Sequence, residues 1–294
     1  MLNKYNPATE KFLHFKLEST NSIEVSITTI TQDKNGKLWI GTYSQGIFLF
    51  DPATGKIKKW NFNPNSVNGI GNNYITSILQ DVDGFIWIST YNGLNRFDPQ
   101  NPDKGVTKYY SSSDNSNTIN NNLVWRVNQS QTDKNLIWIC TANGLCSYNI
   151  KTGIFNRLNI VAEVPLQFSN SFACVVEQNV FGQNILWAAT YGGLFKIDLN
   201  TKKSEQFISD KNGLLSNQIS QLLLDRSGVL WIATDKGLNY HSLKTQKFNK
   251  IFSQKRFDKD FLELFNSDVK SIISDDENSF YLATSEGLFN LTIT

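Results

Sequence analysis

The chain of 294 residues is poor in the residue types on which several classes of protein depend. Three cysteines are too few, and odd in number, for the disulfide framework that holds small secreted domains together. Two histidines, His14 and His241, leave no basis for a Ser-His-Asp site or a histidine-rich metal cluster. We therefore expect no catalytic residues, no metal site and no cofactor, and a fold held together by its apolar core.

The sequence also lacks an excess of charge of one sign and lacks long apolar runs. It has 28 basic and 26 acidic residues, a net charge of +2, so no overall field attracts nucleic acid or an anionic membrane. No run of about 20 apolar residues predicts a membrane-spanning helix. The first residues, Met1 to Pro7, lack the apolar segment of a signal peptide. We expect no nucleic-acid partner, and a membrane only through other parts of a longer chain.

The cysteines leave one question open. Cys140 and Cys146 flank a predicted hairpin turn at Asn143-Gly144. A two-residue turn would put the two thiols on opposite faces of the hairpin, whereas a three-residue loop would put them opposite each other. Buried thiols are the alternative to a bridge, and for Cys174 they are the expectation.

A repeated tract is what the sequence has in abundance. An apolar residue, Trp or Tyr, an apolar residue, a small residue and Thr return six times, at steps of 48, 51, 49, 44 and 50 residues. The aromatic anchors are Trp39, Trp87, Trp138, Trp187, Trp231 and Tyr281. A period of this length in strand-rich sequence indicates repeated supersecondary units.

Each unit reads as four antiparallel strands. In the second copy the predicted strands are 75–80, 85–90, 94–97 and 107–110. Turns rich in Asp, Asn and Gly separate them, which is the anatomy of a propeller blade. We predict an all-β fold, a β-propeller of four-stranded antiparallel blades, with residues 1–294 forming one domain. The anchor aromatics and the turn aspartates are interpreted as structural, and both histidines are placed on outer strands.

The two ends of the chain begin and stop within a unit. Residues 2–15 match third and fourth strands, and residues 269–293 supply a first, second and third strand without a fourth. The N-terminal fourth strand could complete the sixth blade, giving six blades and a spare strand. We favour the alternative, a seven-bladed parent ring with one blade shared between or truncated at the termini. The chain would then be a fragment of a longer sensor.

The repeat resembles the two-component regulator propeller repeat. That repeat has Asn before an apolar first strand, followed by Asp-x-x-Gly-x-Leu-Trp-Ile-Gly-Thr-x-x-Gly-Leu. Residues 217–238 and 73–94 match it nearly throughout, and the stretch 63–66, Asn-Pro-Asn-Ser, is also typical. The fourth copy departs from the pattern, because residues 177–184 lack the turn Asp-x-x-Gly.

The resemblance implies a function. Such repeats are similar to the periplasmic sensor portions of hybrid two-component histidine kinases of Bacteroidetes. There, two seven-bladed propellers precede a β-sandwich, a membrane span and the kinase, and the sensors often detect glycan breakdown products. The resemblance implies a periplasmic, non-catalytic, inner-membrane-anchored sensor that dimerises through its parent chain and responds to an oligosaccharide. No kinase, receiver or DNA-binding motif occurs in this sequence.

The loops that join second to third strands, and those that enter each first strand, are expected to share one face. Tyr74 lies on one of these loops. The candidate ligand-binding residues are Tyr43, Asn73, Tyr91, Asn122, Trp125, Asn170, Tyr191, Asn217 and Asp235. Aromatic rings with amides suit a sugar, but the asparagines could instead cap strand entries and the tyrosines pack loops. A propeller-fold polysaccharide lyase or glycoside hydrolase, and a protein-interaction scaffold, remain alternatives, because fold alone does not choose between them.

Overall fold

The computed structural model describes residues 2–6, 8–9, 11–17, 25–61, 69–160, 170–180, 182–242, 248–250, 267–274 and 279–292. The stretch 63–66 and Ile293, which the sequence analysis used, lie outside them. Contacts divide the chain into two compact units. Unit 1 holds residues 1–129, 134–141 and 146–157, and unit 2 holds residues 130–133, 142–145 and 158–294. No helix in the described ranges is long and apolar enough to cross a membrane.

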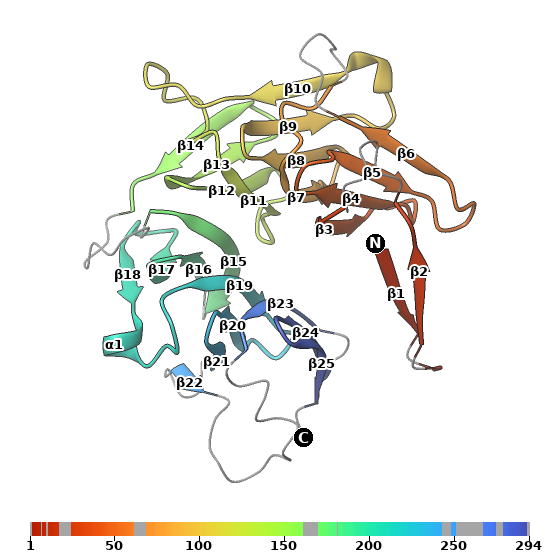
Figure 1. Ribbon diagram of the computed structural model, residues 1–294. Helices are drawn as coiled ribbons and strands as arrows, with labels where there is room; N and C mark the ends of the chain where they lie inside the picture. The colour runs from red at the N-terminus through yellow and green to blue at the C-terminus, as the bar shows by residue number, and fades with distance from the viewer. Residues whose placement is uncertain are drawn as a thin grey trace. The chain divides into compact units, whose positions relative to one another are not determined.

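Unit 1 contains a short hairpin and three antiparallel sheets (Figure 1). The hairpin pairs β1 (Leu2–Asn6) with β2 (Lys11–Phe15). The first blade consists of β3 (Ile27–Gln32), β4 (Leu38–Thr42), β5 (Ile47–Phe50) and β6 (Ile57–Trp60). The second consists of β7 (Ile75–Gln80), β8 (Ile86–Thr90), β9 (Gly93–Phe97) and β10 (Val106–Tyr109), with the 3-10 turn η1 (Pro102–Lys104) before β10. The third consists of β11 (Val124–Gln129), β12 (Leu136–Thr141), β13 (Gly144–Asn149) and β14 (Ile154–Leu158).

Unit 2 contains three further sheets, together with short turn segments of the third blade. The fourth blade consists of β15 (Phe172–Val180), β16 (Gln183–Thr190), β17 (Gly193–Asp198) and β18 (Ser204–Phe207), followed by the helical turn α1 (Ser209–Asn212). The fifth consists of β19 (Ile219–Leu224), β20 (Leu230–Thr234), β21 (Gly237–His241) and β22 (Phe248–Lys250). The sixth shows three strands among the described residues, β23 (Val269–Ser274), β24 (Ser279–Thr284) and β25 (Gly287–Thr292).

The predicted fold is confirmed: the chain is all-β, and the sheets are blades of a β-propeller. The predicted strands of the second copy agree with β7 to β10 within about a residue at each end. The residues that match third and fourth strands at the N-terminus form the hairpin of β1 and β2. Completion of the last blade and a seven-bladed parent ring stay predictions.

An indole–carboxylate pair explains why the motif couples a turn Asp to a strand Trp. Asp81 Oδ1 accepts the backbone N–H groups of Asp83 (3.0 Å) and Phe85 (2.9 Å), and its Oδ2 accepts Trp87 Nε1–H at 2.8 Å. The pair recurs as Asp33 with Trp39 and as Asp225 with Trp231. One buried carboxylate therefore closes the turn and satisfies the polar end of a core indole.

The fourth blade departs from this pattern where its sequence does. Its first two strands run on into a longer hairpin, and Trp187 Nε1 donates to Gln178 Oε1 at 2.8 Å instead of to a turn Asp. Glu177, 4 % exposed, accepts hydrogen bonds from Ser130 Oγ (2.8 Å) and the Gln131 amide (2.7 Å). The Gln178 amide thus takes over the indole bond of the fourth blade, while the Glu177 carboxylate closes the turn after β11 of the third blade.

The anchor rings pack against the next blade. Trp39 lies in one buried cluster with Ile75, Ile86 and Phe97 of the second blade, and Trp187 in another with Leu230 of the fifth. At about 25 cal/mol per Å², burying roughly 150–250 Å² of ring surface contributes about 4–6 kcal/mol as an upper bound. The structural interpretation of these rings is therefore confirmed.

A bulge recurs at the same place in every first strand. The register shifts after Ile27, Ile75, Val124, Phe172, Ile219 and Val269. In three blades the extra residue carries a hydroxyl that donates to a carbonyl of the next first strand. These bonds join Thr28 Oγ1 to Ile75 O (2.7 Å), Thr76 Oγ1 to Val124 O (2.5 Å) and Ser220 Oγ to Val269 O (2.5 Å). A bulge re-aims one side chain, and here it ties neighbouring blades together.

Two sequence questions are settled by packing. Cys140, Cys146 and Cys174 are buried thiols without a bridge, and burial raises the pKa of Cys146 to about 12.

The placement of both histidines on outer strands is wrong for His241. It ends the third strand β21, is 8 % exposed, and its ring centroid lies 5.3 Å from that of Trp187. The alternation of the strand turns it inward.

Candidate functional site

Backbone hydrogen bonds hold the candidate loops in a repeated arrangement. After the second strand, Tyr91 N donates to Tyr74 O (3.1 Å), which ties the loop to the first-strand entry of the same blade. Two residues later, Gly93 N donates to Asn122 O (2.6 Å), the entry of the next blade. The same pairing occurs in unit 2, where Gly193 N donates to Asn217 O (2.9 Å). In each unit the predicted loops therefore lie side by side.

Two of the predicted asparagines are engaged in this framework. Asn122 Oδ1 accepts Ser111 N–H and Asn217 Oδ1 accepts Ser209 N–H, both at 2.7 Å. Asn73 and Asn170 contribute their carbonyls, to Gly46 N (3.2 Å) and Gly144 N (2.7 Å). For Asn122 and Asn217 these contacts support the alternative that the side chains cap strand entries, because a side-chain oxygen used for a cap is less available to a ligand.

The aromatic candidates of unit 1 come together. Tyr74 and Tyr91 are stacked, with centroids 5.5 Å apart and planes at 20°. Tyr43 from the first blade meets Tyr74 edge-on at 5.0 Å and 87°. Trp125 from the third blade meets Tyr91 edge-on at 5.9 Å and 81°. We call these four rings the aromatic platform: Tyr43, Tyr74, Tyr91 and Trp125.

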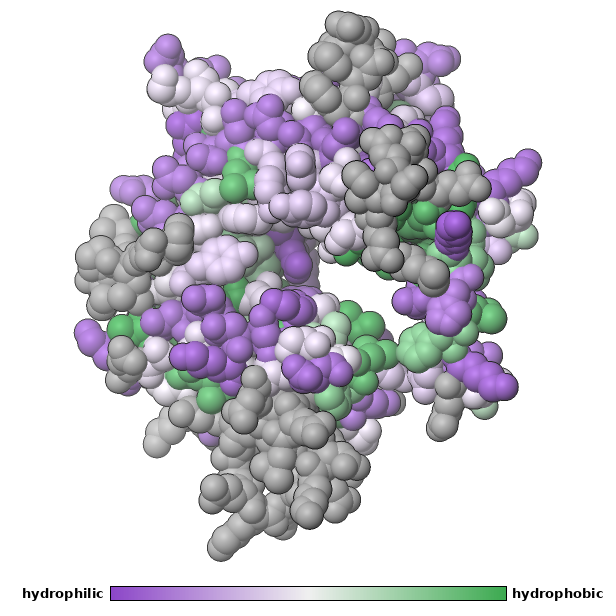
Figure 2. All heavy atoms as spheres, in the orientation of Figure 1, coloured by the Kyte–Doolittle hydropathy of each residue, from purple (hydrophilic) through white to green (hydrophobic). Residues whose placement is uncertain are grey.

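The platform is open to solvent. Tyr43 is 51 % exposed, Tyr74 38 % and Tyr91 39 %, while Trp125 is half-buried. The hydroxyls of these three tyrosines have no hydrogen-bond partner among the described residues. Contiguous exposed aromatic surface is uncommon on a soluble protein and marks an interaction site. On the face drawn in Figure 2, strongly hydrophobic side chains show as small separate areas.

Sequence reasoning placed Tyr74 on a loop but left it outside the candidate set, although it is central to the platform. The available signal was its pairing position. A residue just before a first strand faces the residue just after the second strand, here Tyr91. Cross-strand neighbours of this kind interact directly.

Two candidates of unit 2 are held by backbone bonds and are half-buried. Tyr191 is half-buried, and its N–H donates to Ser171 O at 3.3 Å. Asp235 is half-buried with a backbone bond to Gln218 O (3.3 Å), and its Oδ1 is buried without a hydrogen-bond partner in the described ranges. Both lie on the predicted loops.

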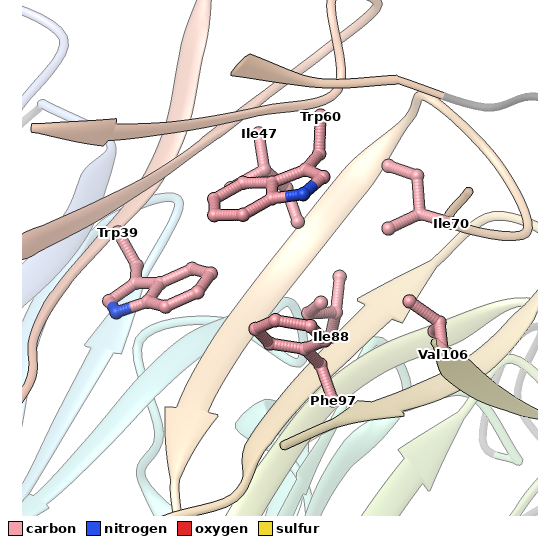
Figure 3. Close-up of a pocket in the computed structure, with 7 residues that line it drawn as sticks. All are labelled: Trp39, Ile47, Trp60, Ile70, Ile88, Phe97 and Val106. Carbon is pink, nitrogen blue, oxygen red and sulfur yellow. The ribbon is translucent and has the colours of Figure 1, made fainter. Parts of the chain in front are cut away.

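A small cavity between the first and second blades is part of the core. It is lined by Trp39, Ile47, Trp60, Ile70, Ile88, Phe97 and Val106 (Figure 3). Trp39 and Trp60 stack at 5.4 Å and 7° beside it. The lining is aliphatic and aromatic, and the indole N–H of Trp39 is already donated to Asp33. So few polar groups neither orient a ligand nor hold a water, and we assign this cavity to blade packing.

Comparison with known proteins identifies the repeats. Residues 21–44, 69–92 and 213–236 match the family model described as two component regulator propeller. Three segments of this propeller are therefore similar to the two component regulator propeller repeat.

Two proteins with longer chains are also similar to this one. Histidine kinase P4 of Formosa agariphila is 31 % identical over 164 residues, which span 50 % of this chain and 11 % of that protein. A solved extracellular domain, described as that of a hybrid two component system from B. thetaiotaomicron, is 25 % identical with a TM-score of 0.72. The match covers 91 % of this chain and 34 % of that one. This chain thus spans about a tenth of the length of the histidine kinase and about a third of the length of the extracellular domain.

A third similarity concerns the fold alone. Virginiamycin B lyase from Staphylococcus aureus superposes with a TM-score of 0.70 at 13 % identity, over 99 % of this chain and 87 % of the lyase. Identity at this level says nothing of shared chemistry, since propellers host many functions.

Proposed function

We propose that this chain is the ligand-recognition part of an extracytoplasmic sensor in a two-component signalling system, and that it is not itself an enzyme. The observation that carries the proposal is the regulator propeller repeat, together with 25 % identity to an extracellular two component domain over 91 % of this chain. In this proposal the propeller is periplasmic. A longer inner-membrane-anchored protein supplies the kinase and the contact between two copies.

We further propose that the signal is an oligosaccharide. Exposed aromatic rings stack on the apolar faces of sugars, and amides bond their hydroxyls. The loops of unit 1 offer such rings, with Asn92 exposed beside Tyr91. Binding at the loops would bias the parent chain through the backbone bonds that join neighbouring blades.

Two arginines of unit 1 support a non-catalytic role. Arg157 donates to the carbonyls of Ser112, Thr118 and Ile119, each at 3.0 Å, and so fixes the loop between β10 and β11. The Arg96 guanidinium lies 3.7 Å from the ring centroid of Phe85. Both are engaged in packing rather than directed at a substrate.

Isothermal titration of the chain against a panel of oligosaccharides tests the proposal. Chromatography of each mixture after long incubation tests the enzyme alternative. We expect reversible binding of at least one oligosaccharide without cleavage. Appearance of shorter or unsaturated products would favour the lyase or hydrolase alternative, and failure of the whole panel to bind would overturn the oligosaccharide assignment.

A further inference from the structure

The bulge of the third blade is built differently from those of the first and second. In the first and second blades the extra residue is a threonine, whose hydroxyl ties one first strand to the next. At the same place the third blade has Trp125, which has no hydroxyl. The bulge turns this indole onto Tyr91 on a surface open to solvent. Where the first two blades use this position to join neighbouring strands, the third blade places a large aromatic ring there without burying it fully, which makes Trp125 a candidate for function.

The four rings span three blades. Tyr43 comes from the loop after β4, Tyr74 and Tyr91 from the two ends of the β7–β8 hairpin, and Trp125 from β11. Neighbouring ring centroids are 5.0 to 6.2 Å apart, comparable with the size of one sugar ring. The outer two rings stand nearly perpendicular to the stacked pair. Such a surface presents faces and edges to several rings of one ligand.

The loops that carry the platform hold no charged residue. Residues 43–46, 71–74, 91–93 and 120–125 consist of Tyr, Ser, Gln, Gly, Asn, Leu, Val and Trp. Lys59 reaches the first of these loops from β6. Its ammonium is engaged by Gln45 Oε1 (3.0 Å) and lies 5.1 Å from the ring centroid of Phe48. An acidic ligand would need cationic donors for its charge, which these loops do not supply.

We propose that the aromatic platform is the ligand site and that it selects neutral oligosaccharides over uronate-containing or sulfated ones. This inference rests on the proposed function. Stacking supplies the affinity, and the tyrosine hydroxyls with the exposed Asn92 amide supply hydrogen bonds to sugar hydroxyls. Selectivity follows from the absence of charge in these loops, because a carboxylate or sulfate would lose its water without gaining a partner.

The test compares four variants of the chain by isothermal titration. The probes are short neutral gluco-, xylo- and manno-oligosaccharides, oligogalacturonates and sulfated oligosaccharides. Tyr91→Ala removes a central ring, and Tyr91→Phe keeps the ring without its hydroxyl. Trp125→Thr installs the residue found at this bulge in the first two blades. Phe12→Ala, a 48 % exposed ring on the N-terminal hairpin, is the matched control, and thermal unfolding of each variant monitors folding.

We expect a neutral probe to bind the wild-type chain and the Phe12→Ala control alike. Tyr91→Ala and Trp125→Thr should each weaken binding roughly three- to tenfold, with a smaller loss for Tyr91→Phe. Equal affinity of folded Tyr91→Ala and Trp125→Thr for a bound neutral probe would overturn the site while leaving the proposed function intact. Binding of acidic probes alone would likewise overturn the proposed site and leave the proposed function intact. Failure of every probe would overturn both proposals.

Discussion

At the scale of single residues, the turn aspartate is the most demanding position of the repeat. Its two carboxylate oxygens serve three donors, two backbone amides and one indole, and Asp81 is only 1 % exposed. Each donor would be left without a partner if the carboxylate were removed, and unsatisfied buried groups cost more than a made bond contributes.

We therefore expect Asp81→Ala to lower the free energy of unfolding of its unit by about 2–4 kcal/mol. Asp83→Ala in the same turn is the control, because its side chain is exposed and the turn uses only its backbone N–H. Urea unfolding followed by tryptophan fluorescence measures both. Equal stability of the two variants would contradict the role assigned to Asp81.

We expect His241 to make the stability of the protein depend on pH. Burial lowers the pKa of His241, and the nearby Lys196 charge lowers it further. The unfolded chain then binds a proton near pH 6.5, before the folded chain does. Stability should fall as the pH drops through 6.5, and level off below the folded pKa.

The measurement is the midpoint of thermal unfolding between pH 8 and pH 5. His241→Phe keeps an aromatic ring between Trp187 and Phe248 and should reduce the fall in midpoint. His14→Ala, on the exposed strand β2, should show the same fall as the wild-type chain. A full fall in His241→Phe would show that other groups cause the pH dependence.

At the scale of elements, the turn after the second strand of the second blade packs closely against the end of the fourth strand of the same blade. Gly93 has φ +97°, and a Cβ there would lie 2.8 Å from Tyr110 Cε1 and 2.9 Å from Tyr109 O. Gly55 also has a positive φ, +70°, but no atom lies within 4 Å of its Cβ position. Backbone strain is common to both glycines, whereas close approach is peculiar to Gly93.

Gly55→Ala should therefore cost about 1–2 kcal/mol from the left-handed conformation alone. Gly93→Ala should cost about 3 kcal/mol or more, because the strand β10 must also shift. Urea unfolding of the two variants separates strain from crowding. A similar loss in both would mean that the loop yields without disturbing its neighbours.

At the scale of the whole molecule, the local parts of the fold were predictable and the long-range parts were not. The Asp turn, the anchor Trp and the Gly after each second strand lie within one repeat, so their spacing reveals the blade. The inward turn of His241 and the gathering of Tyr43, Tyr74, Tyr91 and Trp125 depend on strand register and on neighbouring blades. The sequence of a single repeat does not determine these relations.

The crystal structure of the chain with its tightest-binding neutral oligosaccharide tests the central claim most directly. The account predicts sugar rings lying against the faces of the platform, in contact with Tyr91 and Trp125, and hydrogen bonds from the tyrosine hydroxyls. An oligosaccharide bound elsewhere on the chain, with these four rings still facing solvent, would contradict it.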